Sequence, residues 1–216
     1  MNKIFTIGHS TNSLDSFIRL LESNRIDTLV DVRSVPYSSF ASRFNKEQLS
    51  IFLKKNKVNY IPMGELLGAR YEDKKLLFED GKVNFSKVIK TKKFQKGIVR
   101  IETGIKKGYQ IALMCSEKNP MECHRFSLIS RFLDQKGYIV NHIMGKNLFN
   151  HKLLENNLLL YYHKRRKLSV DINKINQPHS IQHTLFNEDK PDQTKLYFEL
   201  NRLIAYDSNI RSNEAI

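Results

Sequence analysis

The residues best suited to chemistry lie in one segment, CSEKNPMECHR, which runs from Cys115 to Arg125. A predicted strand precedes this segment, and a predicted helix begins near Cys123. Backbone N–H groups and the positive end of the dipole at a helix start favour an anion, and Arg125 adds a group that binds phosphate through paired hydrogen bonds. The same field lowers the pKa of a cysteine at position 123 and favours its thiolate. The segment therefore predicts a site for an anion beside two thiol groups.

The two cysteines allow more than one interpretation. In the first interpretation, Cys115 or Cys123 acts as a nucleophile. In the second, Cys123 only caps the helix and packs against it. A phosphatase-like or rhodanese-like loop is not expected, because Met121 stands six residues after Cys115, where tyrosine phosphatases have their arginine, and the loop contains no glycine. A metal site is not expected either, because Cys-x7-Cys-His is not a usual spacing of zinc ligands.

Further polar residues follow the other predicted strands, and ligands of open parallel sheets bind beyond the carboxyl ends of the strands. His9 and Ser10 follow the first strand, and Asp31 and Arg33 lie at the end of the second. Glu65 and Arg70 follow the third strand, and His142 lies at the end of the fifth. The candidates for general acid or base are His9, Asp31 and Glu117. The candidates for holding a phosphate or another part of a substrate are Ser10, Arg33, Arg70, His124 and Arg125. One alternative stays open: Asp31 and Arg33 lie two apart on a strand, point the same way and form a purely structural pair.

The elements that must position these residues alternate between strand and helix. The predicted strands are Ile4–Ile7, Thr28–Val32, Val58–Pro62, Gln110–Met114 and Tyr138–Ile143, the last of which ends the sheet. A long basic helix is expected over about 85–107, with Gly97 as the point where it splits. The alternation predicts an α/β fold with an open, mostly parallel sheet and helices on both faces.

The composition changes after about Gly145, where basic and polar residues become more frequent. We therefore expect an α/β domain over residues 1–149 and a basic helical C-terminal extension over 150–216. The extension comprises a helix over 150–167, a polar linker over 171–184 and a last helix over about 193–205. That last helix either docks on the core or binds a partner, and the sequence leaves both open.

The charge balance points to a polyanionic partner. The chain has 36 Lys and Arg residues against 22 Asp and Glu residues, a net charge of +14. Basic side chains on the long helix over about 85–107 and at the end of the helix over 150–167 predict a surface that binds the phosphate backbone of nucleic acid. These residues are Lys92, Lys93, Lys96, Lys164, Arg165, Arg166 and Lys167. The alternative is an ordinary solvated helix face in a lysine-rich chain. No apolar run is long enough for a membrane helix. The N-terminal segment is not typical of a secretory signal, so the expected location is the cytoplasm, with both thiols reduced.

Several segments in a fixed order resemble one protein family. They are TIGHSTNSLDSF, LVDVRSVPYSSF, the Leu-Gly of MGELLGARY, and LMCSEKNPMECHR followed by V-x-H-I. Together they resemble the DUF488 family over about residues 3–144. The resemblance implies a compact α/β domain of uncharacterised biochemical role, with its characteristic residues at His9, Ser10, Asp31, Arg33, Pro36, Gly68, Cys115, Glu117, Pro120, Cys123, His124 and Arg125.

The sequence favours an enzyme that acts on a phosphate-bearing substrate, most plainly a nucleotide or a nucleic acid. Hydrolase or transferase chemistry fits better than redox chemistry, and no cofactor is expected, because no dinucleotide fingerprint appears. The first alternative is a non-catalytic nucleic-acid-binding protein that uses its basic helix and tail. The second is an oligomer or adaptor that recruits its partner through the last helix.

Overall fold

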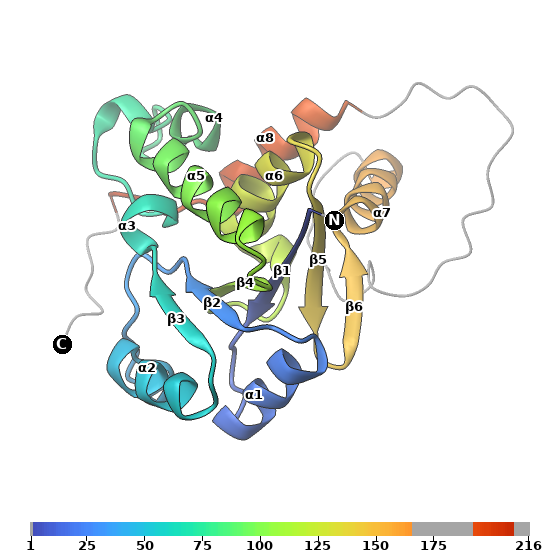
Figure 1. Cartoon of the computed structure of the whole chain (residues 1–216). Coiled ribbons are helices and arrows are strands. Elements are labelled where there is room, and N and C mark those ends of the chain that lie inside the picture. The colour runs from blue at the N-terminus through green and yellow to red at the C-terminus, as the bar shows by residue number, and fades with distance from the viewer. Residues whose placement is uncertain (1, 166–191, 210–216) are drawn as a thin grey trace, which may run out of the picture.

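A computed structural model describes residues 2–165 and 192–209 (Figure 1). Its centre is a six-stranded sheet with the strand order β3-β2-β4-β1-β5-β6. The strands are β1 (Lys3–Gly8), β2 (Thr28–Asp31), β3 (Asn59–Pro62), β4 (Ile111–Cys115), β5 (Ile139–Met144) and β6 (Asn147–Asn150). All neighbours among β1 to β5 are parallel, and β6 runs antiparallel to β5. The predicted α/β class with a mostly parallel sheet is confirmed.

The expectation that the sheet ends with the strand over Tyr138–Ile143 is wrong. β6 follows β5 through a two-residue turn in which Gly145 has a φ of 60°. Glycine at the first central position suits such a hairpin turn, because it adopts positive φ without strain. The strand escaped prediction because it is short and its residues are exposed or half-buried, so it lacks the apolar pattern of a buried strand.

Helices cover both faces of the sheet, as predicted (Figure 1). One face packs on α1 (Leu14–Ser23) and α2 (Lys46–Lys55), and the other packs on α3 (Gly64–Leu67), α4 (Phe85–Val88), α5 (Lys92–Lys106) and α6 (Arg131–Gln135). Alternate residues of each strand face opposite sides, so Leu113 enters one core and Met114 the other. Every residue of β4 is buried, because this strand lies between β1 and β2 with helices above and below.

The long helix expected over 85–107 is broken, although not at Gly97. α4 ends at Val88 and α5 begins at Lys92, where the hydroxyl of Thr91 accepts a hydrogen bond from the N–H of Phe94 at 3.2 Å. Gly97 lies inside α5, where a Cβ would come within 2.6 Å of Leu67 Cδ2. The glycine thus serves the close packing of α5 on α3.

The segment after β4 contains a 3-10 turn over Pro120–Glu122 and a π-helical turn over Arg125–Ser130 that continues into α6. Two further short 3-10 turns span Ser42–Phe44 and Lys74–Leu76. The predicted helix start near Cys123 is therefore correct to within two residues, although Cys123 itself has extended backbone angles.

Two helices follow the sheet, α7 (His151–Arg165) and α8 (Gln193–Ile204). α8 buries Leu196, Tyr197 and Leu200 in a cluster with Phe126 and with residues of α7, so it docks on the rest of the fold. Of the predicted basic residues, Lys164 and Arg165 belong to the last turn of α7, whereas Arg166 and Lys167 lie outside the described residues. Within 2–165 and 192–209, no helix is both long enough and apolar enough to cross a membrane.

Candidate functional site

The carboxyl ends of β1 and β4 bring two chain segments together. The N–H of His9 donates to the carbonyl of Cys115 at 3.0 Å, and the N–H of Ser10 donates to the carbonyl of Ser116 at 2.8 Å. Gly8 makes this approach possible, because a Cβ there would lie only 1.8 Å from the carbonyl oxygen of Glu117. The loop after β4 therefore crosses directly over the end of β1.

Asp31 and Arg33 form a buried ion pair at the end of β2. Arg33 donates from Nε to Asp31 Oδ1 at 2.9 Å and from Nη2 to Oδ2 at 2.6 Å, and Nη2 also donates to the carbonyl of Phe44. The hydroxyl of Tyr60 donates to Asp31 Oδ2 at 2.6 Å. Burial acts to lower the pKa of Arg33, but the bonds to Asp31 outweigh it and raise the pKa. The geometry is that of the structural pair, because most N–H donors of the Arg33 guanidinium already bond to other groups of the protein.

His9 completes this group. Its Nδ1 lies 3.0 Å from the carbonyl oxygen of Ser10, which can only accept, so Nδ1 carries the proton and Nε2 accepts from Arg33 Nη1 at 3.2 Å. The ring stacks on Phe44 with 4.5 Å between centroids. Burial lowers the pKa of His9 to about 4, so the imidazole is neutral near pH 7. Because both ring nitrogens have protein partners, His9 is placed to orient Arg33.

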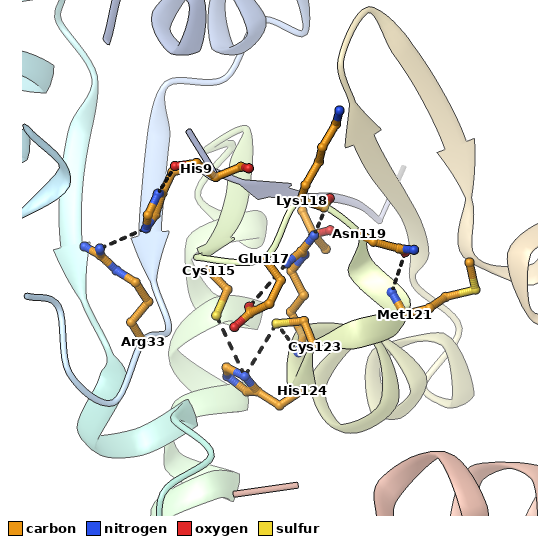
Figure 2. Close-up of polar contacts among 12 residues, drawn as sticks. His9, Arg33, Cys115, Glu117, Lys118, Asn119, Met121, Cys123 and His124 are labelled. Atoms are coloured by element: carbon orange, nitrogen blue, oxygen red, sulfur yellow. Dashed lines mark hydrogen bonds and ion pairs between the residues drawn. The ribbon is translucent and has the colours of Figure 1, made fainter. Parts of the chain in front are cut away.

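Cys115, Cys123 and His124 form a second group, which we call the thiol cluster. His124 Nδ1 lies 3.6 Å from Cys123 Sγ and 3.9 Å from Cys115 Sγ. Figure 2 shows the imidazole facing both sulfur atoms. The loop folds back because Asn119 Oδ1 accepts from the N–H of Met121 at 3.1 Å and so starts a 3-10 turn. That turn returns positions 123 and 124 to the end of β4.

The protons in the thiol cluster are unevenly shared. Burial acts to raise the pKa of Cys123, but the hydrogen bond from Cys115 and the charge of Arg125 lower it well below its ordinary value. The hydrogen bond to Cys123, together with burial, raises the pKa of Cys115. Burial acts to lower the pKa of His124, but the negative charge of Cys123 outweighs it and raises the pKa. Of the two cysteines, Cys123 is therefore the one that more readily forms a thiolate.

Glu117 and Arg125 border the thiol cluster. The Glu117 side chain is 42% exposed, and its Oε2 lies 3.8 Å from Arg125 Nη1. Burial and the nearby Cys123 raise the pKa of Glu117. The Arg125 side chain is 1% exposed and donates from Nη2 to the carbonyl of Lys118 at 3.1 Å. Among the described residues, Arg125 Nε, Arg125 Nη1 and His124 Nε2 have no hydrogen-bond partner.

Other predicted site residues lie apart from these two groups. Arg70 is exposed, and its guanidinium lies 5.0 Å from the ring centroid of Tyr206. Ser10 contributes its backbone, with a φ of 47°. The placement of His142 at the edge of the site is wrong: β5 continues to Met144, and the fully buried His142 ring bonds to Thr6 Oγ1 at 2.7 Å.

Sequence reasoning missed Tyr60. Tyr60 is an ordinary half-buried strand residue by sequence, and its bond to Asp31 follows only from the pairing of β3 with β2. The sequence contained no signal for that pairing. A cavity of about 440 Å³ lies elsewhere, between α5 and the sheet, with Val30, Ile61 and Ile111 in its lining.

Fold and site together define an α/β protein with two cysteines, a histidine, a glutamate and an arginine at the carboxyl ends of its parallel strands. The profile of a family described as "Domain of unknown function DUF488" matches residues 13–132. This match spans more than half of the 216 residues, and the chain belongs to the DUF488 family. The resemblance seen in the sequence is thus confirmed. No curated protein and no solved structure matches the chain.

Proposed function

We propose that this protein is an enzyme that acts on a phosphate-bearing substrate, a nucleotide or a nucleic acid, beside the thiol cluster. The observation that carries the proposal is Arg125, a nearly fully buried cation whose Nε and Nη1 lack hydrogen-bond partners among the described residues. A buried donor without a hydrogen-bond partner is costly, and a phosphate oxygen is a strong, charge-assisted acceptor for a guanidinium N–H. A phosphate oxygen supplies the missing acceptors.

Glu117 connects phosphate binding to chemistry in this proposal. Its exposed carboxylate now lies 3.8 Å from Arg125 Nη1 and shields that donor. A phosphate that binds Arg125 replaces the carboxylate there and leaves Glu117 free to transfer a proton next to Cys115 and Cys123. Arg33 and His9 are positioning residues, since their polar atoms mainly serve the protein itself. Hydrolysis and group transfer are the reaction classes that fit these roles.

The surface near the site favours nucleic acid within this class. α5 precedes β4 and packs beside it, so the start of α5 lies toward the carboxyl ends of the strands. The contact of Gly97 with Leu67 supports this placement, because α3 follows the carboxyl end of β3. Lys92, Lys93 and Lys96 in this half of α5 are all exposed. In this proposal their charges attract a phosphate backbone that extends from the site.

The test measures binding of labelled DNA, RNA and nucleotides over a salt series. We expect Arg125→Gln to weaken binding at least about tenfold at every salt concentration and to lower the salt slope by about one. Lys107→Gln, an exposed lysine at the other end of α5, is the matched control and leaves binding almost unchanged. Thermal unfolding checks each variant, and Arg125→Lys, which keeps the charge but loses the planar fork, gives an intermediate affinity.

Turnover is followed by mass spectrometry of the same oligonucleotides and nucleotides after incubation with the full chain. We expect Glu117→Gln to lower product formation while it preserves binding. The proposal is overturned if the folded wild type binds none of these ligands at low salt, or if the Glu117 and Arg125 variants form product at the wild-type rate.

The second candidate function is nucleic-acid binding without catalysis. The exposed positions of Lys92, Lys93 and Lys96 favour it, because these charges need no part of the thiol cluster. It predicts that neutralising the three lysines removes binding, whereas Arg125→Gln has no effect and no product forms. The same salt series therefore separates the two functions.

A further inference from the structure

We propose that Cys115, Cys123 and His124 bind a thiophilic divalent metal ion of the zinc type, with one coordination position open toward Glu117. Whether the chain binds the metal does not depend on the proposed function. Any role of the metal in a reaction does rest on the proposed function. The argument starts from the distances within the thiol cluster.

These distances fit a common metal. A tetrahedral zinc ion with Zn–S bonds of about 2.3 Å and a Zn–N bond of about 2.0–2.1 Å separates sulfur from nitrogen by about 3.6 Å. The two observed separations are 3.6 Å for Cys123 and 3.9 Å for Cys115. All three donor atoms lie within 4.8 Å of one another. Only small side-chain shifts are needed for the three atoms to share one ion.

The fold holds the donor atoms in place without a metal. Cys115 is the last residue of the buried strand β4, and the N–H of Arg125 donates to Cys123 Sγ at 3.4 Å. The turn at Asn119 fixes the return of the loop. The sequence spacing argued against a metal because familiar zinc spacings place paired cysteines on one short turn. Here a strand end and a helix start supply the donors instead, so spacing along the chain is a poor guide.

The donor types select the class of metal. Two sulfur atoms and an imidazole suit zinc and related soft or borderline ions, whereas magnesium and calcium prefer oxygen ligands. Two thiolates and a neutral imidazole also balance the charge of a divalent ion.

The position of Glu117 suggests a reactive site. Three protein donors with a fourth position left open are typical of catalytic zinc, since structural sites have four protein ligands. Glu117 is the exposed residue beside both thiols, and Figure 2 shows its carboxylate next to the sulfur atoms. A metal bound here would supply Lewis acidity beside the Glu117 carboxylate.

The experiment uses the full chain, purified under reducing conditions and freed of metal with a chelator. Cobalt(II) is titrated as a spectroscopic probe, and zinc is then added. We expect one equivalent of cobalt to produce a thiolate-to-cobalt charge-transfer band in the near ultraviolet, which zinc abolishes. Cys115→Ser, Cys123→Ser and His124→Gln each lose the band. His151→Gln, a change at a buried histidine of α7 outside the thiol cluster, retains it.

A second measurement, made on the wild type, tests the proposal if the serine variants do not fold. In the wild type, zinc is expected to protect both thiols from alkylation, with the modified cysteines counted by mass spectrometry. The proposal fails if the folded, reduced protein gives no band and no protection, or if folded Cys115→Ser and Cys123→Ser both keep the band. Neither readout involves a nucleotide, so metal binding and phosphate binding succeed or fail separately.

Discussion

Asp31 and Arg33 show how two neighbouring residues can look catalytic in a sequence and be structural in the fold. Their positions after a buried strand allow both interpretations. The structure favours the second, because Asp31 accepts from Arg33 and Tyr60 while Arg33 also serves Phe44 and His9. Both side chains of the ion pair are at most 4% exposed. The pair thus joins β2, β3 and the loop before α2.

We predict that Asp31→Asn destabilises the protein strongly, by about 3–5 kcal/mol, because it leaves the Arg33 charge buried without its anionic partner. Urea unfolding followed by circular dichroism gives the free energy of unfolding. Glu47→Gln is the control, since it removes a carboxylate from an exposed hydrogen bond to Tyr37. A loss below about 1 kcal/mol for Asp31→Asn, typical of a surface pair, would contradict this account.

The residues of the candidate site could largely be named from the sequence, but their grouping could not. Residue type and strand position identified His9, Arg33, Cys115 and Cys123. Whether Cys115 meets His124 depends on the course of the loop after β4, which the turn at Asn119 determines. Distances of this kind arise from tertiary structure and leave no periodic pattern in the chain.

At the scale of elements, Gly8 limits how β1 and the loop after β4 can approach. We predict that Gly8→Ala lowers the free energy of unfolding by about 1–3 kcal/mol. The new Cβ would collide with the Glu117 carbonyl, so the backbone must move to make room for it. The same movement shifts Glu117 relative to the thiol cluster, so cobalt binding should weaken as well. Chemical denaturation and the cobalt titration measure the two effects.

Gly104→Ala is the matched control for that prediction. Its Cβ would meet only the flexible Ile111 side chain, with Cδ1 nearest at 2.8 Å, and alanine favours the helix by up to about 1 kcal/mol. We therefore expect stability to be unchanged or raised. If both alanine variants behave alike, close approach at Gly8 is not the cause.

Elements with strong apolar patterns were predictable, and those governed by local packing were not. β4 is uniformly apolar, and its identity as a central strand followed from that pattern. The break between α4 and α5 falls at the Thr91 cap, although the sequence pointed to Gly97. Which glycine breaks a helix depends on what packs against it, and the sequence does not show this.

At the scale of the molecule, a buried chain of hydrogen bonds links the sheet to both C-terminal helices. It runs from Thr6 through His142 and His151 to Tyr197, with 3.1 Å between the two rings and 3.1 Å from His151 Nε2 to the Tyr197 hydroxyl. Phe126 lies against both histidines. The chain connects β1, β5, α7 and α8.

This chain predicts acid sensitivity. Burial lowers the pKa of His151 from 6.5 to about 3, and the charges of Lys152 and Arg131 add to the effect. As the pH falls below 6.5, the unfolded state takes up the proton first, so stability is present above that pH and is lost progressively down to about 3. From pH 7 to pH 5, His151 alone should cost about 2 kcal/mol. His142, whose pKa burial also lowers, acts in the same direction.

Urea unfolding at pH 7, 6 and 5 tests this prediction. His151→Gln keeps a polar side chain that does not titrate, so its loss of stability between pH 7 and pH 5 should be smaller by about the same 2 kcal/mol. A variant as acid-sensitive as the wild type would show that other groups are responsible.

The docking of α8 has a consequence for biosynthesis. Asn201 of α8 accepts from the N–H of Phe85 and donates to the carbonyl of Val83, in the middle of the sequence. Until α8 has been synthesised and has left the ribosome, those backbone groups and the apolar surface around Phe126 lack their cover. The sheet can form earlier, but we expect the nascent chain to be a client of chaperones until its last described helix emerges.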